Sequence, residues 1–398
     1  MSARYDSPAA QRLPRDGMVR MFMLAGELAA AGRDIVHLEI GEPDFDTPAY
    51  VTEAGKAALD AGATHYAPVA GLPALREAIA ADASAFRGLD VPYAGANVIV
   101  GPGAKPVVWN LMAAVLGPGD ELICADPGYP VFAAATAFAG ATLIPVRLHE
   151  ATGWRFDLDE LRAKITPRTR AIVLNSPQNP TGGMQLHEDI AAVADLALRH
   201  DLLVITDEIY SRIVYDGAFA SIAQVPEMRE RTVIVDGFSK SYAMTGWRLG
   251  YCIAPLPIAA TLTLLANQTY QCVATFVQRA GIAALAGDQS FIAERQAIFR
   301  ERRDVVVAGL NALPGVRCAT PPGAFYAFPN VTGVTPDDAV LAEFLLREAG
   351  VATIPGSAFG ANGRGHLRVS YAASLPQLQH ALTAIEAALG TFAAAGRT

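Results

Sequence analysis

Two cations and one carboxylate stand at the ends of apolar runs in the middle of the chain. Lys240 follows the run TVIVDGF, Arg248 comes eight residues later at the start of a second apolar run, and Asp207 ends the run LLVITDE. A lysine beside a second cation is expected to have a lowered pKa, and its neutral amine is a nucleophile toward carbonyl carbon. A lone lysine is more often a solvated surface charge, so its surroundings decide between these interpretations.

The elements that position these residues are short apolar runs alternating with helical patterns. Strands are expected at 97–100, 121–126, 170–176, 202–208, 232–238 and 247–253, with helices at Lys105–Leu116 and about His187–His200 among them. Nearly continuous apolar strands separated by helices predict an α/β fold, with a mostly parallel sheet sandwiched by helices. The pattern changes near residue 290, which predicts a smaller α+β domain. We therefore expect an N-terminal arm at 1–45, a large domain at 46–289 and a small domain at 290–398.

In open parallel sheets, ligands bind beyond the carboxyl ends of the strands. Six successive strand ends of this chain each offer a polar or aromatic group to that edge. These groups are Gly103, Ala104 and Lys105, then Tyr129, Asn179, Asp207 with Tyr210, Lys240, and Arg248.

The glycine turn before the first helix suits a phosphate. Free amides at Gly103, Ala104 and Lys105 would bind it at a helix N-terminus, and Arg248 would add a bidentate contact. A dinucleotide fingerprint is excluded because position 106 is proline where a third glycine is needed. A plain turn is the alternative for this weak motif.

Asp207 alone has three interpretations: a helix cap, a metal ligand, or an anion facing a protonated ring nitrogen. The seven histidines show no ligand spacing, so no metal site is predicted. One cofactor uses all the groups: pyridoxal phosphate offers an aldehyde to Lys240, a ring nitrogen to Asp207, and a phosphate to the helix end. Its phenolate oxygen would meet Asn179 and Tyr210, and Tyr129 would stack on its ring.

Composition narrows the partners and the compartment. The 398 residues are 52% hydrophobic with a formal net charge of -8, which makes nucleic acid an unexpected general partner. Four widely spaced cysteines and no signal-peptide pattern predict a reducing, cytoplasmic setting. The charge-free stretch 249–278 is interrupted by Pro255 and Pro257, so we expect a buried or subunit-interface helix rather than a membrane span.

Six segments give the chain a family resemblance. They are GEPDFDTP (41–48), HYAPVAGLPALREAIA (65–80), NSPQNPTGG (175–183), TDEIY (206–210), SKSYAMTGWRLGY (239–251) and GHLRVSYA (365–372). In this order, across nearly the whole chain, they resemble the class I/II aminotransferases, a fold-type-I family of pyridoxal phosphate enzymes. The resemblance implies a seven-stranded type of sheet in the large domain. It also implies transfer of an amino group between an L-amino acid and a 2-oxo acid, by a ping-pong Schiff-base mechanism.

The resemblance also implies a role for each matching residue. Lys240 matches the catalytic Schiff-base lysine, and Arg368 matches the arginine that binds the substrate α-carboxylate, beside the Gly41 backbone and Asn179. Tyr66 matches a tyrosine that reaches the phosphate of the neighbouring subunit, which implies a homodimer with shared active sites. The cofactor-binding matches are Asn179, Asp207, Tyr210 and Arg248.

The chain departs from the family at one position and leaves two choices open. Gly237 stands where many relatives have a phosphate-binding serine, and Ser239 is expected to take over. A β-lyase or synthase of the same fold is an alternative activity. A transcription regulator would need a basic DNA-binding module before GEPDF, and only forty residues precede that segment, so this role is not expected. For the substrate side chain, Lys105 suits a distal carboxylate, whereas Trp109, Tyr129 and Phe22 suit an aromatic or aliphatic group.

Overall fold

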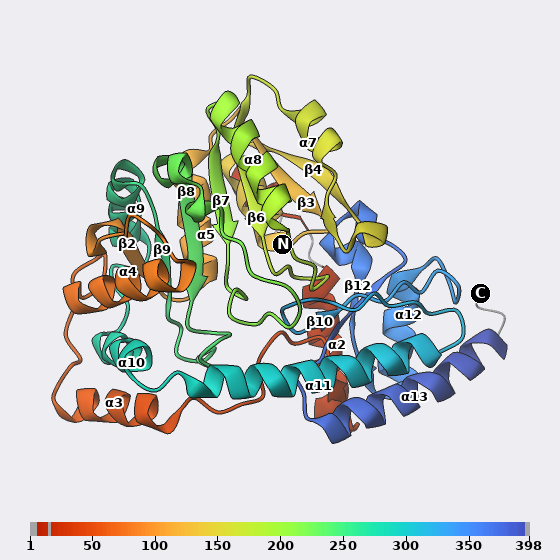
Figure 1. Cartoon of the computed structure of the whole chain (residues 1–398). Helices are drawn as coiled ribbons and strands as arrows, with labels where there is room; N and C mark the ends of the chain where they lie inside the picture. The colour runs from red at the N-terminus through yellow and green to blue at the C-terminus, as the bar shows by residue number, and fades with distance from the viewer. Residues whose placement is uncertain (1–5, 15–16, 395–398) are drawn as a thin grey trace.

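A large twisted sheet forms the centre of the molecule in the computed structural model, which describes residues 6–14 and 17–394 (Figure 1). Its eight strands run in the order β2–β9–β8–β7–β6–β3–β4–β5. Their bounds are β2 Val98–Gly101, β3 Glu121–Asp126, β4 Thr142–His149, β5 Arg155–Phe156, β6 Thr169–Asn175, β7 Leu203–Asp207, β8 Thr232–Gly237 and β9 Gly250–Ile253. The predicted α/β fold is confirmed, with seven main strands and the two-residue β5 at one edge.

Five neighbouring strands, in the order β8, β7, β6, β3 and β4, run parallel to one another. Strand β9 lies between β2 and β8 and is antiparallel to both. All residues of β8 are buried, as expected for strands covered on both faces. Asn175, Asp207 and Val235 lie in register at the carboxyl ends of β6, β7 and β8. The polar groups that follow these strands are thereby brought to one edge.

Helices cover both faces of the sheet. Helices α5 (Ala104–Val115), α6 (Pro130–Ala139) and α9 (Leu256–Thr269) share one apolar cluster with Ile205 and Val235. On the other face, α4 (Pro73–Arg87) and α10 (Thr275–Ala286) pack with Ile234, and α8 (His187–Arg199) packs with Ile172. Two further helices of this part are α3 (Ala49–Asp60) and α7 (Leu158–Lys164).

The C-terminal part has its own small antiparallel sheet, β10–β13–β12. The long helix α11 (Ser290–Ala312) leads from the large sheet into this part, where it contacts α13 (Leu375–Ala394) (Figure 1). The other elements here are β10 Tyr326–Ala327, α12 Asp338–Phe344, the π-helical turn η5 Leu345–Ala349, β11 Val351–Ala352, β12 Ile354–Pro355, the 3-10 turn η6 Gly356–Phe359 and β13 Leu367–Ser370.

The N-terminal segment begins with α1 (Pro8–Gln11) and α2 (Gly17–Ala30), and then joins the C-terminal part. Its strand β1 (Val36–His37) pairs in parallel with β11, and α2 contacts β12. This pairing supports an arm that packs with a small domain, and α11 begins at residue 290. The boundaries at 45/46 and 289/290 stay a prediction.

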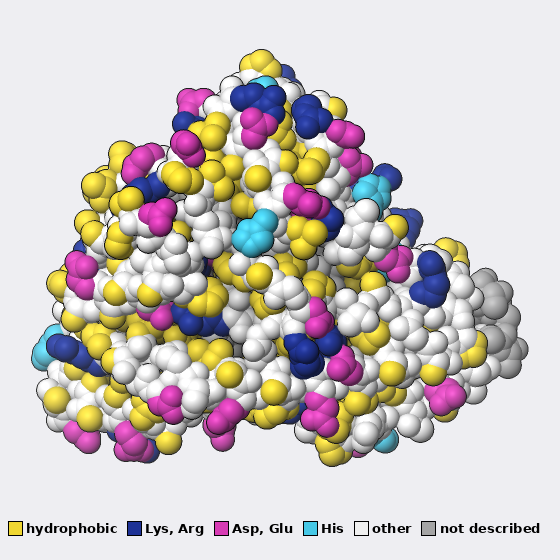
Figure 2. Space-filling view, in the orientation of Figure 1, with side chains coloured by type: hydrophobic (Ala, Val, Ile, Leu, Met, Phe, Trp, Pro, Cys, Tyr) yellow, Lys and Arg dark blue, Asp and Glu magenta, His cyan; other side chains and the backbone are white. Residues whose placement is uncertain are grey.

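Two surface features bear on the expected partners. On the face that Figure 2 shows, basic and acidic side chains are interspersed. Within residues 6–14 and 17–394, no helix has the length and apolarity needed to cross a membrane. The charge-free stretch 249–278 forms β9, α9 and the start of α10, and Leu256 and Leu264 of α9 are exposed.

Candidate active site

A cavity of about 400 Å³ opens at the carboxyl ends of the parallel strands, where the arm, the large sheet and the C-terminal part meet. It brings together most of the residues that the sequence singled out. Of the predicted site residues, those lining it are Gly41, Ala104, Lys105, Tyr129, Asn179, Asp207, Tyr210, Ser239, Lys240, Arg248 and Arg368.

Lys240 follows β8 and its amine donates a hydrogen bond to the carbonyl of Gly41, 2.5 Å away. The pKa of Lys240 is lowered to about 8, mainly by burial; Arg368 and Arg248 also lower it, whereas Glu42 and Asp207 raise it. The direction is the one expected from the sequence, but burial is a larger cause than Arg248. The neutral, nucleophilic form of this amine is therefore more populated near neutral pH than it is in an exposed lysine.

Asp207 ends β7 and is buried. Burial raises the pKa of its carboxyl to about 7, and the negative charges of Asp236 and Glu208 act in the same direction. One oxygen accepts a hydrogen bond from the amide of Ile209 at 3.2 Å. No salt bridge joins Asp207 to another residue of the described chain. A desolvated carboxyl that faces a cavity and makes no salt bridge is suited to a ligand cation.

Arg248 and the start of α5 form one corner of the cavity. Arg248 is exposed, and it donates to the carbonyls of Thr245 at 2.8 Å and Pro102 at 3.4 Å. Gly103 has φ 93°, and a Cβ there would stand 2.2 Å from Arg248 Nη2. The helix end was expected to offer three free amides, but that of Gly103 donates to Gly101 at 2.7 Å. Ala104, the first residue of α5, lines the cavity with Arg248.

Arg368 is held on β13 and almost fully buried, at 2% exposure. Its Nη1 donates to Asn179 Oδ1 at 3.1 Å and its Nη2 donates to the carbonyl of Glu39. The guanidinium lies over the rings of Tyr326 and Phe359, 4.7 and 5.1 Å from their centroids. Its Nε is buried and has no hydrogen-bond partner among the described residues. An oriented cation with an unsatisfied donor is suited to a carboxylate ligand.

Tyr326 was not identified from the sequence, yet it contacts several site residues. Its hydroxyl is 2.7 Å from that of Tyr210, and a Cβ on Gly41 would stand 2.0 Å from the same oxygen. Burial raises the pKa of Tyr210, so its hydroxyl keeps its proton and can donate. In the sequence, Tyr326 lies within the apolar run AFYAF, which gives no signal beyond an aromatic core.

Two predicted residues are not among those lining the cavity. Gly103 lies against Arg248 just behind it, and Tyr66 is 84% exposed at the surface. An exposed tyrosine is what a contact with a second subunit would need, and this role of Tyr66 stays a prediction. Further lining residues not identified from the sequence include Met18, Glu42, Asn175 and Thr245.

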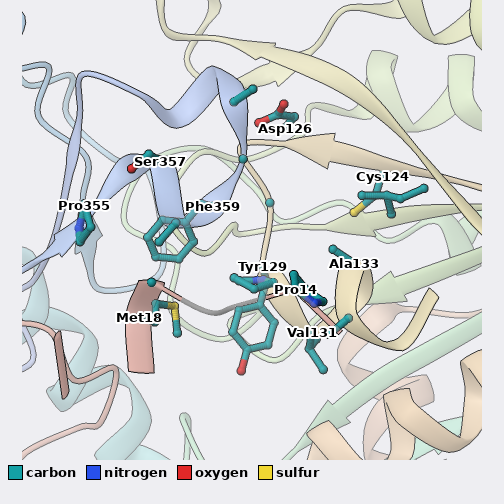
Figure 3. Close-up of a pocket in the computed structure, with 18 of the residues that line it drawn as sticks. Pro14, Met18, Cys124, Asp126, Tyr129, Val131, Ala133, Pro355, Ser357 and Phe359 are labelled. Atoms are coloured by element: carbon teal, nitrogen blue, oxygen red, sulfur yellow. The ribbon is translucent and has the colours of Figure 1, made fainter. Parts of the chain in front are cut away.

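A second cavity, of about 760 Å³, adjoins the first and shares Met18, Lys105, Tyr129 and Val131 with it. Figure 3 shows Tyr129 between Met18, Val131 and Phe359 at this second cavity. The ammonium of Lys105 lies 5.7 Å from the Tyr129 ring centroid. Of the alternative side-chain contacts, Phe22 lines the first cavity and Trp109 the second.

The donor set fits pyridoxal phosphate rather than a metal. No group of three or more His, Cys, Asp or Glu side chains in the described part of the chain could hold a metal ion. Asp207, which makes no salt bridge, matches the ring nitrogen of the cofactor. The Lys240 amine matches its aldehyde, and the corner formed by Gly103 and Arg248 matches its phosphate.

Comparisons with known proteins show the fold and the class of protein to which the chain belongs. A solved aspartate aminotransferase from Thermus thermophilus with maleate superposes with a TM-score of 0.91, at 38% identity, covering 96% of this chain and 99% of that one. Among curated proteins, the aspartate aminotransferase of Pyrococcus horikoshii is 40% identical over 367 residues, 91% of this chain and 93% of its own length. The aspartate/prephenate aminotransferase of Thermus thermophilus is 39% identical over 387 residues, 96% and 98% of the two lengths.

The sequence profile described as aminotransferase class I and II matches residues 33–385. The chain therefore belongs to the class I and II aminotransferases, as the six segments indicated, and is an enzyme of this transferase class.

Proposed function

We propose that this chain binds pyridoxal 5'-phosphate in the 400 Å³ cavity and transfers amino groups between L-amino acids and 2-oxo acids. When bound, the cofactor supplies an aldehyde that accepts the amino group and a ring that takes up the electrons of the α-carbon. The observation that carries the proposal is the meeting of Lys240, Asp207 and Arg368 around one cavity.

Three sets of residues would hold the cofactor, at its ring nitrogen, at its ring and phenolate oxygen, and at its phosphate. Asp207 faces the ring nitrogen and favours its protonated form, because a carboxylate in a dry site attracts a cation strongly. Asn179 and Tyr210 donate toward the phenolate oxygen, and Tyr129 covers the ring. Ala104 at the start of α5, with Ser239 and Arg248, holds the phosphate.

Arg368 holds the substrate α-carboxylate and so sets the α-carbon over the cofactor. Its guanidinium is prealigned by Asn179 and by the Glu39 carbonyl, so little orientation entropy is lost on binding. Lys240 would then act as the general base that takes the proton from the substrate α-carbon and delivers it to the C4′ carbon of the cofactor. Its pKa of about 8 suits a base working near neutral pH.

A second copy of the chain is part of the proposal. Tyr66 is exposed, and so are the apolar side chains of Leu256 and Leu264 on α9. A homodimer would bury such groups and bring Tyr66 to the phosphate of the neighbouring subunit. The cytoplasm is the proposed location, in line with four free cysteines.

The test is to incubate the purified protein with pyridoxal phosphate, reduce it with borohydride and map the labelled peptide. We expect the label on Lys240, together with conversion of 2-oxoglutarate to glutamate by a panel of aspartate, aromatic and aliphatic amino donors. Lys240→Ala should lose the label and at least about 10⁴-fold in turnover, since the chemical base and the attachment point go together. Turnover retained by this variant contradicts the assignment.

The same assay separates the aminotransferase from the lyase alternative. A lyase would release pyruvate and ammonia from cysteine conjugates without any 2-oxo acid acceptor. Without the acceptor we expect at most one equivalent of 2-oxo acid per active site and no ammonia, with turnover beginning when the acceptor is added. Lys105→Met tests the side-chain preference. If the Lys105 ammonium meets a distal carboxylate, this variant should lose activity toward aspartate but not toward aromatic donors, because only the carboxylate loses a charge partner.

A further inference from the structure

Three charged side chains are buried together on the side of the sheet away from the cavity. Arg87, at the end of α4, donates through Nε to Glu208 at 2.7 Å and through Nη2 to Asp236 at 3.0 Å. The side chains of Arg87 and Glu208 are each 1% exposed and that of Asp236 is 11% exposed. None of the three lines the cavity, so no direct contact with a ligand explains them.

The cluster lies directly behind Asp207. Glu208 follows Asp207 in the chain, and Asp236 follows Val235, the strand partner of Asp207 on β8. Because successive side chains point to opposite faces of a strand, Glu208 and Asp236 lie on one face while Asp207 lies on the other. The amide of Glu208 donates to the Val235 carbonyl at 2.9 Å, so this register continues past the end of β7.

The cluster carries one more negative than positive charge, and its hydrogen bonds are satisfied. Glu208 accepts from the hydroxyls of Thr206 at 3.0 Å and Ser221 at 2.7 Å, and Asp236 accepts from the Gly237 amide at 2.7 Å. Burying three charges is costly, and well-packed apolar side chains would often be as stable. An arrangement kept at such a cost beside a functional carboxyl suggests a role in that function.

We propose that Arg87, Glu208 and Asp236 are positioning residues whose net negative charge, one strand away from Asp207, strengthens the hold of Asp207 on the protonated ring nitrogen of the cofactor. This inference rests on the proposed function. The charge of Arg87 balances one of the two carboxylates behind Asp207, so that a single negative charge remains there. The remaining negative charge attracts a proton shared between Asp207 and the ring, in a site where screening by water is weak.

Glu208→Gln is the sharpest variant because it removes one charge and can keep every contact. The amide oxygen can accept from Arg87, and the amide nitrogen can donate to Thr206 and Ser221, whose hydroxyls can rotate to accept. Asp236→Asn removes the same charge from the neighbouring strand if the first variant fails to fold. Asp189→Asn on α8 is the matched control, because Asp189 is also buried and bonded to an arginine, Arg155, and a backbone amide.

The experiment measures the dissociation constants of the apoenzyme for pyridoxal phosphate and for its 1-deaza analogue, in which carbon replaces the ring nitrogen. Their ratio isolates the interaction at the nitrogen from all other contacts. We expect the wild type to prefer pyridoxal phosphate, and Glu208→Gln to lower this preference by about tenfold, or ~1.4 kcal/mol, with affinity for the analogue nearly unchanged. Asp189→Asn should keep the wild-type preference.

An unchanged preference in Glu208→Gln, or equal losses for both compounds, would overturn the inference while leaving the proposed function intact. Equal losses would assign the cluster to structure alone. A wild type that binds neither compound would instead overturn the proposed function itself.

Discussion

Replacement of Arg368 by lysine tests how the cavity selects carboxylated substrates. The native guanidinium is 2% exposed and fixed by Asn179 at 3.1 Å and by two aromatic rings, with its Nε unpaired. Arg368→Lys keeps the charge but loses the planar fork, so the α-carboxylate loses at least one charge-assisted hydrogen bond. Such a bond contributes about 1.5–3 kcal/mol, which predicts a fall in kcat/KM of about 10- to 150-fold.

The assay compares an L-amino acid with the amine that lacks only its carboxylate, such as phenylalanine and phenylethylamine. Single-turnover half-reactions with each give the second-order rate constants for the wild type and the variant. We expect the amino acid to lose about 10- to 150-fold and the amine to lose less than about threefold, because only the amino acid uses the fork.

Equal losses for both donors would refute this reasoning. They would mean that Arg368 supports the cavity through Asn179, Tyr326 and Phe359 rather than by binding a carboxylate. A thermal unfolding curve for the variant is the control, since a general collapse of the site would also lower Tm.

Three further outcomes follow from the same geometry. Gly103→Ala puts a methyl group about where Arg248 Nη2 lies, 2.2 Å from a Cβ at φ 93°, so we expect at least about tenfold weaker binding of inorganic phosphate to the apoprotein by calorimetry. Arg87→Met leaves two buried carboxylates without their cation and should lower the free energy of unfolding by about 3–5 kcal/mol in urea titrations. Because the pKa of Asp207 is raised from 3.8 to about 7, the native apoprotein keeps a proton that the unfolded chain releases. Its stability should therefore fall as pH rises from 3.8 through about 7, and Asp207→Asn should remove this part of the fall.

The sheet and its functional edge were predictable because they depend on local patterns. Apolar runs such as those ending at Asp207 and Gly237 have the length and composition of doubly covered strands, and turns separate them from helices. Once the strands are parallel, their carboxyl ends must share an edge, so the meeting of Asn179, Asp207 and Lys240 follows from topology. The observed ends of helices and strands differ from the predicted ends by one to three residues. Strand β9, for example, begins at Gly250 and was predicted to begin at 247.

Contacts between distant segments were not predictable in the same way. Tyr326 reaches Tyr210 across 116 residues, and Arg87 reaches Glu208 across 121 residues. An aromatic in an apolar run and an arginine near a helix end have no periodicity that distinguishes them from core and surface residues. Arg368 was found only through the family resemblance, since nothing near it in sequence reveals the Glu39 carbonyl that orients it.

The departure at Gly237 is explained by three glycines that lie side by side on β2, β9 and β8. Gly250 pairs with Gly101 on one side and with Gly237 on the other. A Cβ at Gly237 would stand 3.0 Å from Gly250 Cα, and a Cβ at Gly250 would stand 2.4 Å from the Ala104 amide nitrogen. Because these three positions have no side chain, the start of α5 can pack directly against the sheet. Its amide donors are thereby placed where a phosphate can reach them. A serine at 237 would need the backbone at Gly250 to give by a few tenths of an ångström, whereas Ser239 lines the cavity without that shift.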